Sequence, residues 1–222
     1  MPYIAFLRRN PSAGLLLVQL VGIVLYPLME SSAPGRTLFG VFGLLVVGIA
    51  LWVVRRSPWL TWLGVTLALP VVVLSMIMVV TPRPDLMIVS AALEAVFYFY
   101  AAGSLIAYML QDRKVVADEL FAAGATFTLL AWAFAYTFVV CQGLQLGSFG
   151  FSAGVASRSW TELLYCSVAV LSGVGLSDIM PVTPMARALV MLESFAGIMY
   201  IALVVSRLIM LTGNASKDRR QL

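Results

Sequence analysis

The sequence predicts an all-α polytopic membrane protein with six membrane-spanning helices and one re-entrant helix followed by a short strand. Hydrophobic residues make up 62% of the 222 positions and charged residues only 11%, and the mean hydropathy is +1.00. Such values are far from those of soluble domains. Six apolar runs are long enough to cross about 30 Å of hydrocarbon, and a seventh run is too short.

The six predicted spans follow from the apolar runs, because a helix rises about 1.5 Å per residue and needs about 20 residues to cross a bilayer. The spans are residues 13–30, 37–54, 59–80, 88–110, 119–142 and 185–211. The seventh run, 160–171, gives only about 18 Å of helix. We expect it to enter the membrane and return, or to pack on protein.

The basic residues predict the orientation of the spans. Nine of the fourteen flank one face: Arg8, Arg9, Arg55, Arg56, Arg113, Lys114, Lys217, Arg219 and Arg220. The positive-inside rule places that face, with both termini, in the cytoplasm. We therefore expect an integral protein of the bacterial inner (plasma) membrane, and the net charge of +4 requires no nucleic acid as a partner.

The N-terminal segment has a second interpretation as a cleaved secretory signal, because small residues at Ser31 and Ala33 follow its apolar run. Glu30 beside that position favours a retained anchor. The orientation of the later helices is the same in both cases.

Catalytic and metal chemistry have few candidate residues. The chain contains no histidine and two cysteines, Cys141 and Cys166, both within apolar runs. These residues do not make a zinc ligand set, and buried packing is favoured over a disulfide for the cysteines. We expect no enzyme activity and no cofactor.

The polar stretch 111–119, "QDRKVVADE", divides the chain into two parts. We predict a four-helix membrane domain at 1–110, a cytoplasmic linker at 111–118 and a second domain at 119–222. The second domain holds an outer helix, 119–142, the re-entrant segment and an inner helix, 185–211.

The short run "SWTELLYCSVAVLS" begins with a capping box, in which Ser159 and Glu162 each bond the other's backbone amide. A helix therefore begins near Trp160 and points from the outside inward. Its C-terminal carbonyls and partial negative charge favour a cation in the membrane. The alternative is a buried interfacial helix with no pore.

The next residues, "GVGLS", form a predicted return strand that rises about 16 Å toward the outside. Glycine lets such a segment turn its carbonyls to one side and line a cavity with oxygen atoms. Asp178 follows at the outer mouth, where its carboxylate attracts cations. The candidate ion-binding residues are Gly173, Val174, Gly175, Leu176 and Ser177.

The segment from "LYCSVAVLSGVGLSDIMPVTPMAR" through the following apolar helix resembles the pore domain of potassium channels. The family signature is Thr-Val-Gly-Tyr-Gly-Asp after a pore helix, then Pro, Thr, Arg and an inner helix with a glycine in mid-span. The matching residues are Val174, Gly175, Asp178, Pro181, Thr183, Arg187 and Gly197.

This resemblance implies a homotetramer in the lipid bilayer, with potassium or sodium ions bound at the carbonyls of residues 173–177. It makes 160–171 the pore helix, 173–177 the selectivity filter and Gly197 the hinge of the inner helix. The alternatives are a non-conducting membrane sensor or scaffold with the channel fold, and a secondary transporter with a broken helix.

Three filter residues depart from the family pattern. Gly173 stands in place of Thr and removes a hydroxyl from the innermost ion site, and Leu176 in place of Tyr removes a phenol. Ser177 replaces the second Gly, which costs about 1 kcal/mol or more if that position needs a positive φ. The other possibility is that Ser177 fits without strain. The departures predict reduced potassium selectivity.

Two membrane carboxylates, Glu94 and Glu193, are functional candidates because charged groups are rare in spans. Glu193 lies about 12 Å into the inner helix. It could respond to protons or act in gating, or it could be a structural group hydrogen-bonded behind the filter. For Glu94, pairing within the bundle or snorkelling is sufficient.

Overall fold

The computed structural model describes residues 10–30, 33–54, 61–81, 84–111, 117–150 and 157–218. Over these residues the chain forms seven helices and two short strands. The helices are α2 (Pro11–Glu30), α3 (Ala33–Val54), α4 (Thr61–Val80), α5 (Pro84–Gln111), α6 (Ala117–Leu144), α7 (Trp160–Leu171) and α8 (Pro184–Asp218). The strands are β1 (Phe149–Gly150) and β2 (Met180–Pro181).

Every predicted span is a helix, and α8 continues past the predicted end at residue 211 to Asp218. Within the described ranges, three helices are long and apolar enough to cross a membrane, over Leu86–Gln111, Asp118–Leu144 and Pro184–Arg207. The described apolar parts of α2, α3 and α4 are shorter, at Pro11–Tyr26, Phe42–Val53 and Trp62–Met78. That α2, α3 and α4 span the membrane therefore stays a prediction.

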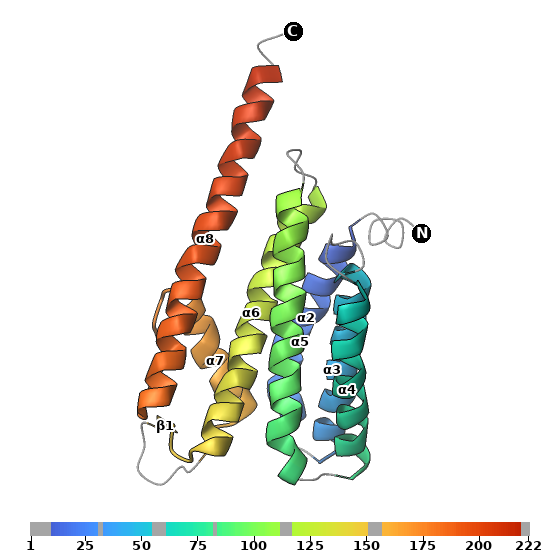
Figure 1. Cartoon of the computed structure of the whole chain (residues 1–222), viewed down its shortest axis with the longest axis vertical. Helices are drawn as coiled ribbons and strands as arrows, with labels where there is room; N and C mark the ends of the chain where they lie inside the picture. The colour runs from blue at the N-terminus through green and yellow to red at the C-terminus, as the bar shows by residue number, and fades with distance from the viewer. Residues whose placement is uncertain are drawn as a thin grey trace.

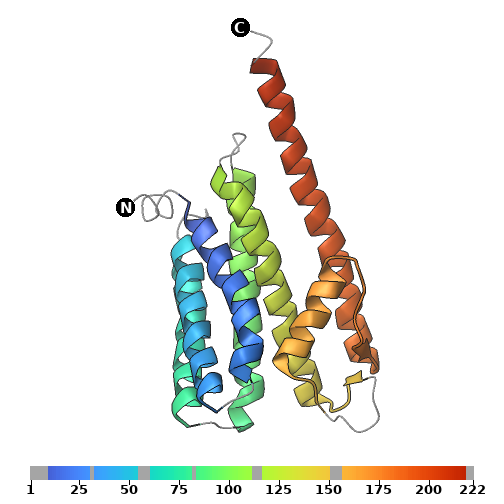
Figure 2. The same ribbon diagram turned by 180° about the vertical axis from the view of Figure 1, so that it is seen from behind.

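Helix α6 lies at the centre of the arrangement, with α5 and α2 packed on one side and α7 and α8 on the other (Figures 1 and 2). Helix α5 forms an antiparallel pair with α6, and α3 and α4 complete the bundle on the side away from α8. Helix α7 packs beside the first half of α8. The start of α2 and the end of α8 lie at the same end of the molecule, as the basic residues predict.

An aromatic cluster joins the four-helix part to the start of α7. The ring of Tyr98 on α5 lies 5.6 Å from that of Trp132 and 5.7 Å from that of Tyr136, both on α6. Trp160 at the start of α7 contacts the same two α6 rings and, at 4.6 Å, the ring of Tyr26 on α2. These contacts place the start of α7 against both halves of the chain.

A carboxylate joins the helices at the opposite end of α6. Asp118 accepts hydrogen bonds from the backbone amide and the hydroxyl of Ser12, at 3.0 and 2.9 Å, and from the phenol of Tyr108 at 3.2 Å. The start of α2, the last turns of α5 and the start of α6 thus meet at one buried group. The four-helix part packs directly on the α6 of its own chain.

Some predictions concern residues outside the described part of the chain. These are the signal-like segment before residue 10, the cleavage position at Ser31, residues 112–116 of the linker, and the tail after residue 218.

Candidate ion-permeation site

Helix α7 spans Trp160–Leu171, the same residues as the predicted re-entrant helix, and begins with the predicted capping box. The amide of Glu162 donates to the Ser159 hydroxyl at 3.3 Å, and the amide of Ser159 donates to the Glu162 carboxylate at 2.8 Å. These two bonds satisfy backbone donors that the first turn leaves open. The helix therefore starts at a position set by its own sequence.

A second set of contacts fixes the start of α7 against the end of α6. The side-chain amide of Gln142 on α6 donates to the carbonyl of Arg158 at 2.8 Å, and its oxygen accepts from the Arg158 amide at 2.9 Å. The Arg158 guanidinium in turn bonds Glu162 at 3.0 Å. The end of α6 thus fixes the position at which α7 begins.

The chain reverses direction at the end of α7 through two glycines in the left-handed region. Gly173 has φ 74° and Gly175 has φ 68°. The amide of Gly173 donates to the carbonyl of Val170 at 3.0 Å, and that of Gly175 to the carbonyl of Ala169 at 2.9 Å. A β-branched residue is strongly disfavoured at such φ values. The backbone here therefore explains why glycine, and not the threonine of the family pattern, occupies position 173.

After this turn the chain runs back along α7, as predicted, but as an irregular segment and not as a regular strand. The carbonyl of Leu176 accepts a hydrogen bond from the phenol of Tyr165 at 2.8 Å, and the carbonyl of Gly175 accepts from the Ser177 amide at 3.0 Å. Two of the five candidate ion-binding carbonyls are thus bonded within the chain.

Tyr165 is a site residue that the sequence analysis missed. Its phenol provides the tie between the return segment and α7 that Leu176, in place of a tyrosine, cannot make. The signal was present, because a tyrosine in an apolar helix needs a partner for its hydroxyl. The sequence alone did not identify that partner, eleven residues further along.

The prediction of strain at Ser177 is wrong. Among the described residues only Gly147, Gly173 and Gly175 have positive φ. Ser177 instead closes a local turn, because its hydroxyl accepts a hydrogen bond from the amide of Ile179 at 3.1 Å. Serine hydroxyls commonly stabilise turns in this way.

The residues after the return segment that match the family pattern take structural positions. Met180 and Pro181 pair with β1 in an antiparallel ladder, and the Thr183 hydroxyl accepts from the Ala186 amide at the start of α8, at 3.3 Å. Arg187 donates to the carbonyl of Pro181 at 3.2 Å. Asp178 is exposed between the return segment and β2.

Two residues one turn apart connect α8 to α7. At Gly197 an added Cβ would lie 2.1 Å from the carbonyl oxygen of Leu171, so the two backbones are in direct contact. Glu193 is fully buried and forms a hydrogen bond with the hydroxyl of Ser167. The structure thus gives Gly197 a packing role; its role as a hinge stays a prediction.

The remaining surface of α8 is apolar and largely uncovered by its own chain. Only 17% of the most apolar stretch of α8 is buried by the rest of the chain. Large exposed side chains follow the helix: Met185, Met191, Leu192, Phe195, Ile198, Met199, Ile201, Val205 and Ile209. Val174 and Leu176 in the return segment are 63% and 72% exposed. This surface suits lipid or further copies of the chain.

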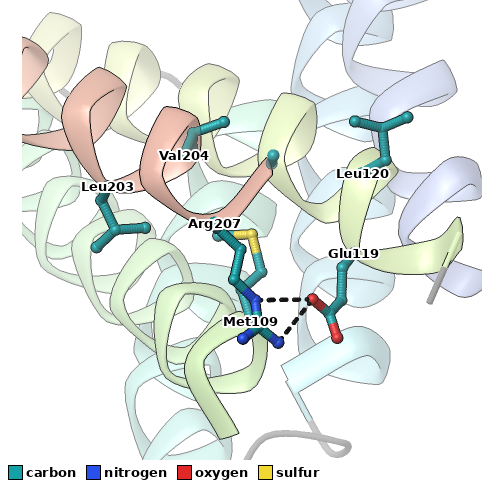
Figure 3. Close-up of a pocket in the computed structure, with 7 residues that line it drawn as sticks. Met109, Glu119, Leu120, Leu203, Val204 and Arg207 are labelled. Carbon is teal, nitrogen blue, oxygen red and sulfur yellow. Dashed lines mark hydrogen bonds and ion pairs between the residues drawn. The ribbon is translucent and has the colours of Figure 1, made fainter. Parts of the chain in front are cut away.

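A buried ion pair joins α6 and α8 far from the filter (Figure 3). The guanidinium of Arg207 donates to one oxygen of Glu119 through Nη2 at 3.1 Å and through Nε at 3.3 Å. The pair borders a small pocket lined by apolar side chains of α5, α6 and α8. The sequence analysis did not pair these residues, which are 88 positions apart.

The remaining candidate residues from the sequence are Glu94 and the two cysteines. Glu94 accepts a hydrogen bond from Ser90 on the same helix at 3.3 Å, in line with pairing inside the bundle. Cys141 and Cys166 are free and buried, so they form no disulfide. Within the described residues, no group of three or more His, Cys, Asp or Glu side chains could hold a metal ion.

The second half of the chain is similar to a known protein family. Residues 115–213 match a protein-family model whose description is "Ion channel". The matched segment holds α6, α7, the return segment and most of α8. No curated protein and no solved structure matches the chain.

Proposed function

We propose that this chain, whose residues 115–213 are an ion channel domain consistent with the potassium-channel pore-domain family, assembles as a homotetramer and passes monovalent cations. The observation that carries the proposal is the sequence of elements: a capped pore helix, a glycine turn, a return segment beside that helix, and a long apolar inner helix. Together they bring backbone carbonyls into the membrane where an ion path needs them.

Fourfold assembly is supported by what one chain leaves incomplete. A single copy supplies one return segment, whereas a carbonyl-lined filter needs a ring of them. The exposed apolar face of α8 is a surface that neighbouring copies would bury. Mass photometry of the purified protein in detergent should give the mass of four chains. A distribution of monomers and dimers alone would contradict the proposal.

Reduced potassium selectivity is supported by the geometry of the return segment. Selectivity depends on the number and placement of the carbonyl oxygens that replace the hydration shell. Leu176 directs its carbonyl to Tyr165, and Gly173 offers no hydroxyl. Both ends of the filter should therefore bind potassium less well than in the family pattern, and sodium should pass as well.

The test restores the family pattern and frees the bonded carbonyl. One variant carries Gly173→Thr, Leu176→Tyr and Ser177→Gly together, so that residue 173 must also leave the positive φ that disfavours threonine. A second variant carries Tyr165→Phe, which removes only the phenol. Reversal potentials are measured in bilayers under opposed potassium and sodium gradients. We expect the restored variant to shift toward the potassium potential and Tyr165→Phe to shift selectivity measurably. If the unaltered protein already excludes sodium as strongly as the restored variant, the selectivity proposal is wrong.

A non-conducting sensor or scaffold is the second candidate function. The observation in its favour is that the carbonyls of Gly175 and Leu176 are both bonded inside the chain. Ion flux through purified protein in liposomes separates the two candidates. A transporter is less favoured, because transporters carry interruptions in both halves, and within the described residues only the second half contains a re-entrant break.

We place both termini in the cytoplasm of a bacterial cell, with the filter toward the outside. The support is the common end of α2 and α8 together with the basic residues that flank it in the sequence. Labelling of single cysteines added at either terminus, in intact cells and in opened membranes, tests this orientation. Labelling of intact cells by an impermeant reagent would contradict it.

A further inference from the structure

Glu193 is a buried carboxyl group at the meeting point of three helices. It lies on α8 with no accessible surface, and one of its oxygens, Oε1, is hydrogen-bonded to the hydroxyl of Ser167 on α7. The same hydroxyl lies 2.8 Å from the carbonyl oxygen of Ala131 on α6. Ser167 is itself fully buried. One hydroxyl thus links the outer helix, the pore helix and the inner helix.

The number of protons available to the oxygens of Ser167, Ala131 and Glu193 determines whether the Glu193 carboxyl is charged or neutral. A serine hydroxyl has one proton and donates one hydrogen bond, whereas a backbone carbonyl only accepts. The contact between Ser167 and Ala131 therefore uses the serine proton. The hydrogen bond between the Ser167 oxygen and Glu193 then needs a proton that belongs to the Glu193 carboxyl. A carboxylate has none, but a neutral carboxylic acid does.

The surroundings of Glu193 also favour the neutral form. Its second oxygen, Oε2, is buried without a hydrogen-bond partner, which is costly for a charged oxygen and much less so for the carbonyl of an acid. Among the described residues the two ion pairs are Arg158–Glu162 and Arg207–Glu119, so neither supplies a cation here.

The groups that face Glu193 from its neighbours carry no positive charge. From α7 the group bonded to Glu193 is the Ser167 hydroxyl, while the thiol of the preceding residue, Cys166, is directed to the carbonyl oxygen of Ile179 at 3.8 Å. From α6 the facing group is the backbone carbonyl of Ala131, through Ser167. An ionised Glu193 would therefore be a buried charge without compensation.

We propose that Glu193 is a neutral carboxylic acid that donates its proton to Ser167 and thereby holds the pore helix at a set distance from the inner helix. This contact lies one helical turn from the backbone contact between Gly197 and Leu171, because Glu193 precedes Gly197 by four residues on α8 and Ser167 precedes Leu171 by four residues on α7. Leu171 is followed directly by the glycine turn. Glu193 is thus a positioning residue for the filter, an inference that rests on the proposed function.

Loss of the proton would reorganise this contact. The Ser167 hydroxyl would turn its only proton to the carboxylate, and its hydrogen bond to Ala131 would be lost. Glutamine at position 193 keeps a donor toward Ser167 without a titratable proton, whereas leucine keeps similar bulk and has no donor. This pair of substitutions separates the hydrogen bond from the space that the side chain fills.

The first test is spectroscopic and does not depend on ion flux. Infrared spectra of the purified wild-type protein and of Glu193→Gln are compared at neutral pH. We expect the carbonyl-stretch band of a buried protonated acid in the wild type and its loss in the variant. Ser167→Ala should move the band to higher frequency, because the acid loses its acceptor. Glu162→Gln, which removes an ion-paired carboxylate, is the control and should leave the band unchanged.

The second test measures flux in liposomes for the same proteins. We expect Glu193→Gln to retain most of the wild-type flux and its ion preference, and Glu193→Leu and Ser167→Ala to lose at least about half of the flux. Equal spectra for the wild type and Glu193→Gln would overturn the protonated state. Equal flux for Glu193→Gln and Glu193→Leu would overturn the positioning role. Absence of flux in the wild type would refute the proposed function, while the spectra would still decide the state of Glu193.

Discussion

Substitution of Gly197 by alanine tests the packing of α8 against α7. The added Cβ would lie 2.1 Å from the carbonyl oxygen of Leu171, 2.9 Å from its carbonyl carbon and 3.0 Å from its Cα. All three atoms are backbone, so no side chain can rotate away. Either α8 or the end of α7 must move.

The structure gives the size of the effect. Because real Cβ atoms do not approach within 3.0 Å of other atoms, the two helices must separate by about 1 Å, and overpacking of this kind costs about 1–3 kcal/mol. The displaced residue, Leu171, lies two positions before Gly173, so filter geometry should change as well.

The assay is thermal unfolding of the detergent-solubilised protein, followed by potassium flux in liposomes. Gly48→Ala on α3 is the matched control, because its added Cβ would meet no atom within 4 Å apart from the adjoining backbone of its own helix, and alanine is the better helix former by about 1 kcal/mol. We expect Gly197→Ala to lower the melting temperature and the control to leave it unchanged or raise it.

This comparison also separates packing from hinge motion. If Gly197 serves only as a hinge, alanine should alter flux and leave the melting temperature at the wild-type value. A melting temperature for Gly197→Ala equal to that of the wild type would refute the packing argument, whatever the flux.

Two further predictions concern charges. Glu119→Gln should destabilise the fold by about 3–5 kcal/mol, because it leaves the Arg207 guanidinium buried without its carboxylate; Glu162→Gln, whose side chain is 42% exposed, should cost less than about 1 kcal/mol. Thermal or denaturant unfolding measures the stability loss of both variants. Equal losses would contradict the conclusion that the buried Glu119–Arg207 pair stabilises the fold more than the exposed Arg158–Glu162 pair. Open probability should depend weakly on voltage, because residues 88–110 contain no Arg or Lys and each charge moved is worth about 2.3 kcal/mol per 100 mV. A gating charge of several units per subunit in bilayer recordings would disprove this.

The elements that the sequence predicted best are those with local signals. Helix α7 begins and ends at the predicted residues because a capping box starts it and a glycine with positive φ follows it. Helices over the six apolar runs were predicted because length and hydropathy are properties of the chain alone, while membrane spanning by α2, α3 and α4 stays a prediction. Glu193 became a candidate because carboxylates are rare in apolar helices, and its burial and its bond to Ser167 agree with the structural alternative.

The parts that could not be predicted depend on contacts distant in sequence or on backbone geometry. The strain at Ser177 was inferred from the family pattern, but the local turn gives that residue an ordinary φ. The bond from Tyr165 to Leu176 requires the path of the return segment. The pairing of Glu119 with Arg207 depends on how α6 and α8 pack, which no local pattern contains.

Ion flux from the purified protein in liposomes tests the central claim most directly. Liposomes loaded with potassium and placed in sodium are compared with protein-free liposomes and with the reverse gradient. The account predicts flux that depends on protein, for potassium in one direction and measurably for sodium in the other. No flux above that of protein-free liposomes, from a preparation shown to be tetrameric, would contradict the claim that this chain forms a cation pore.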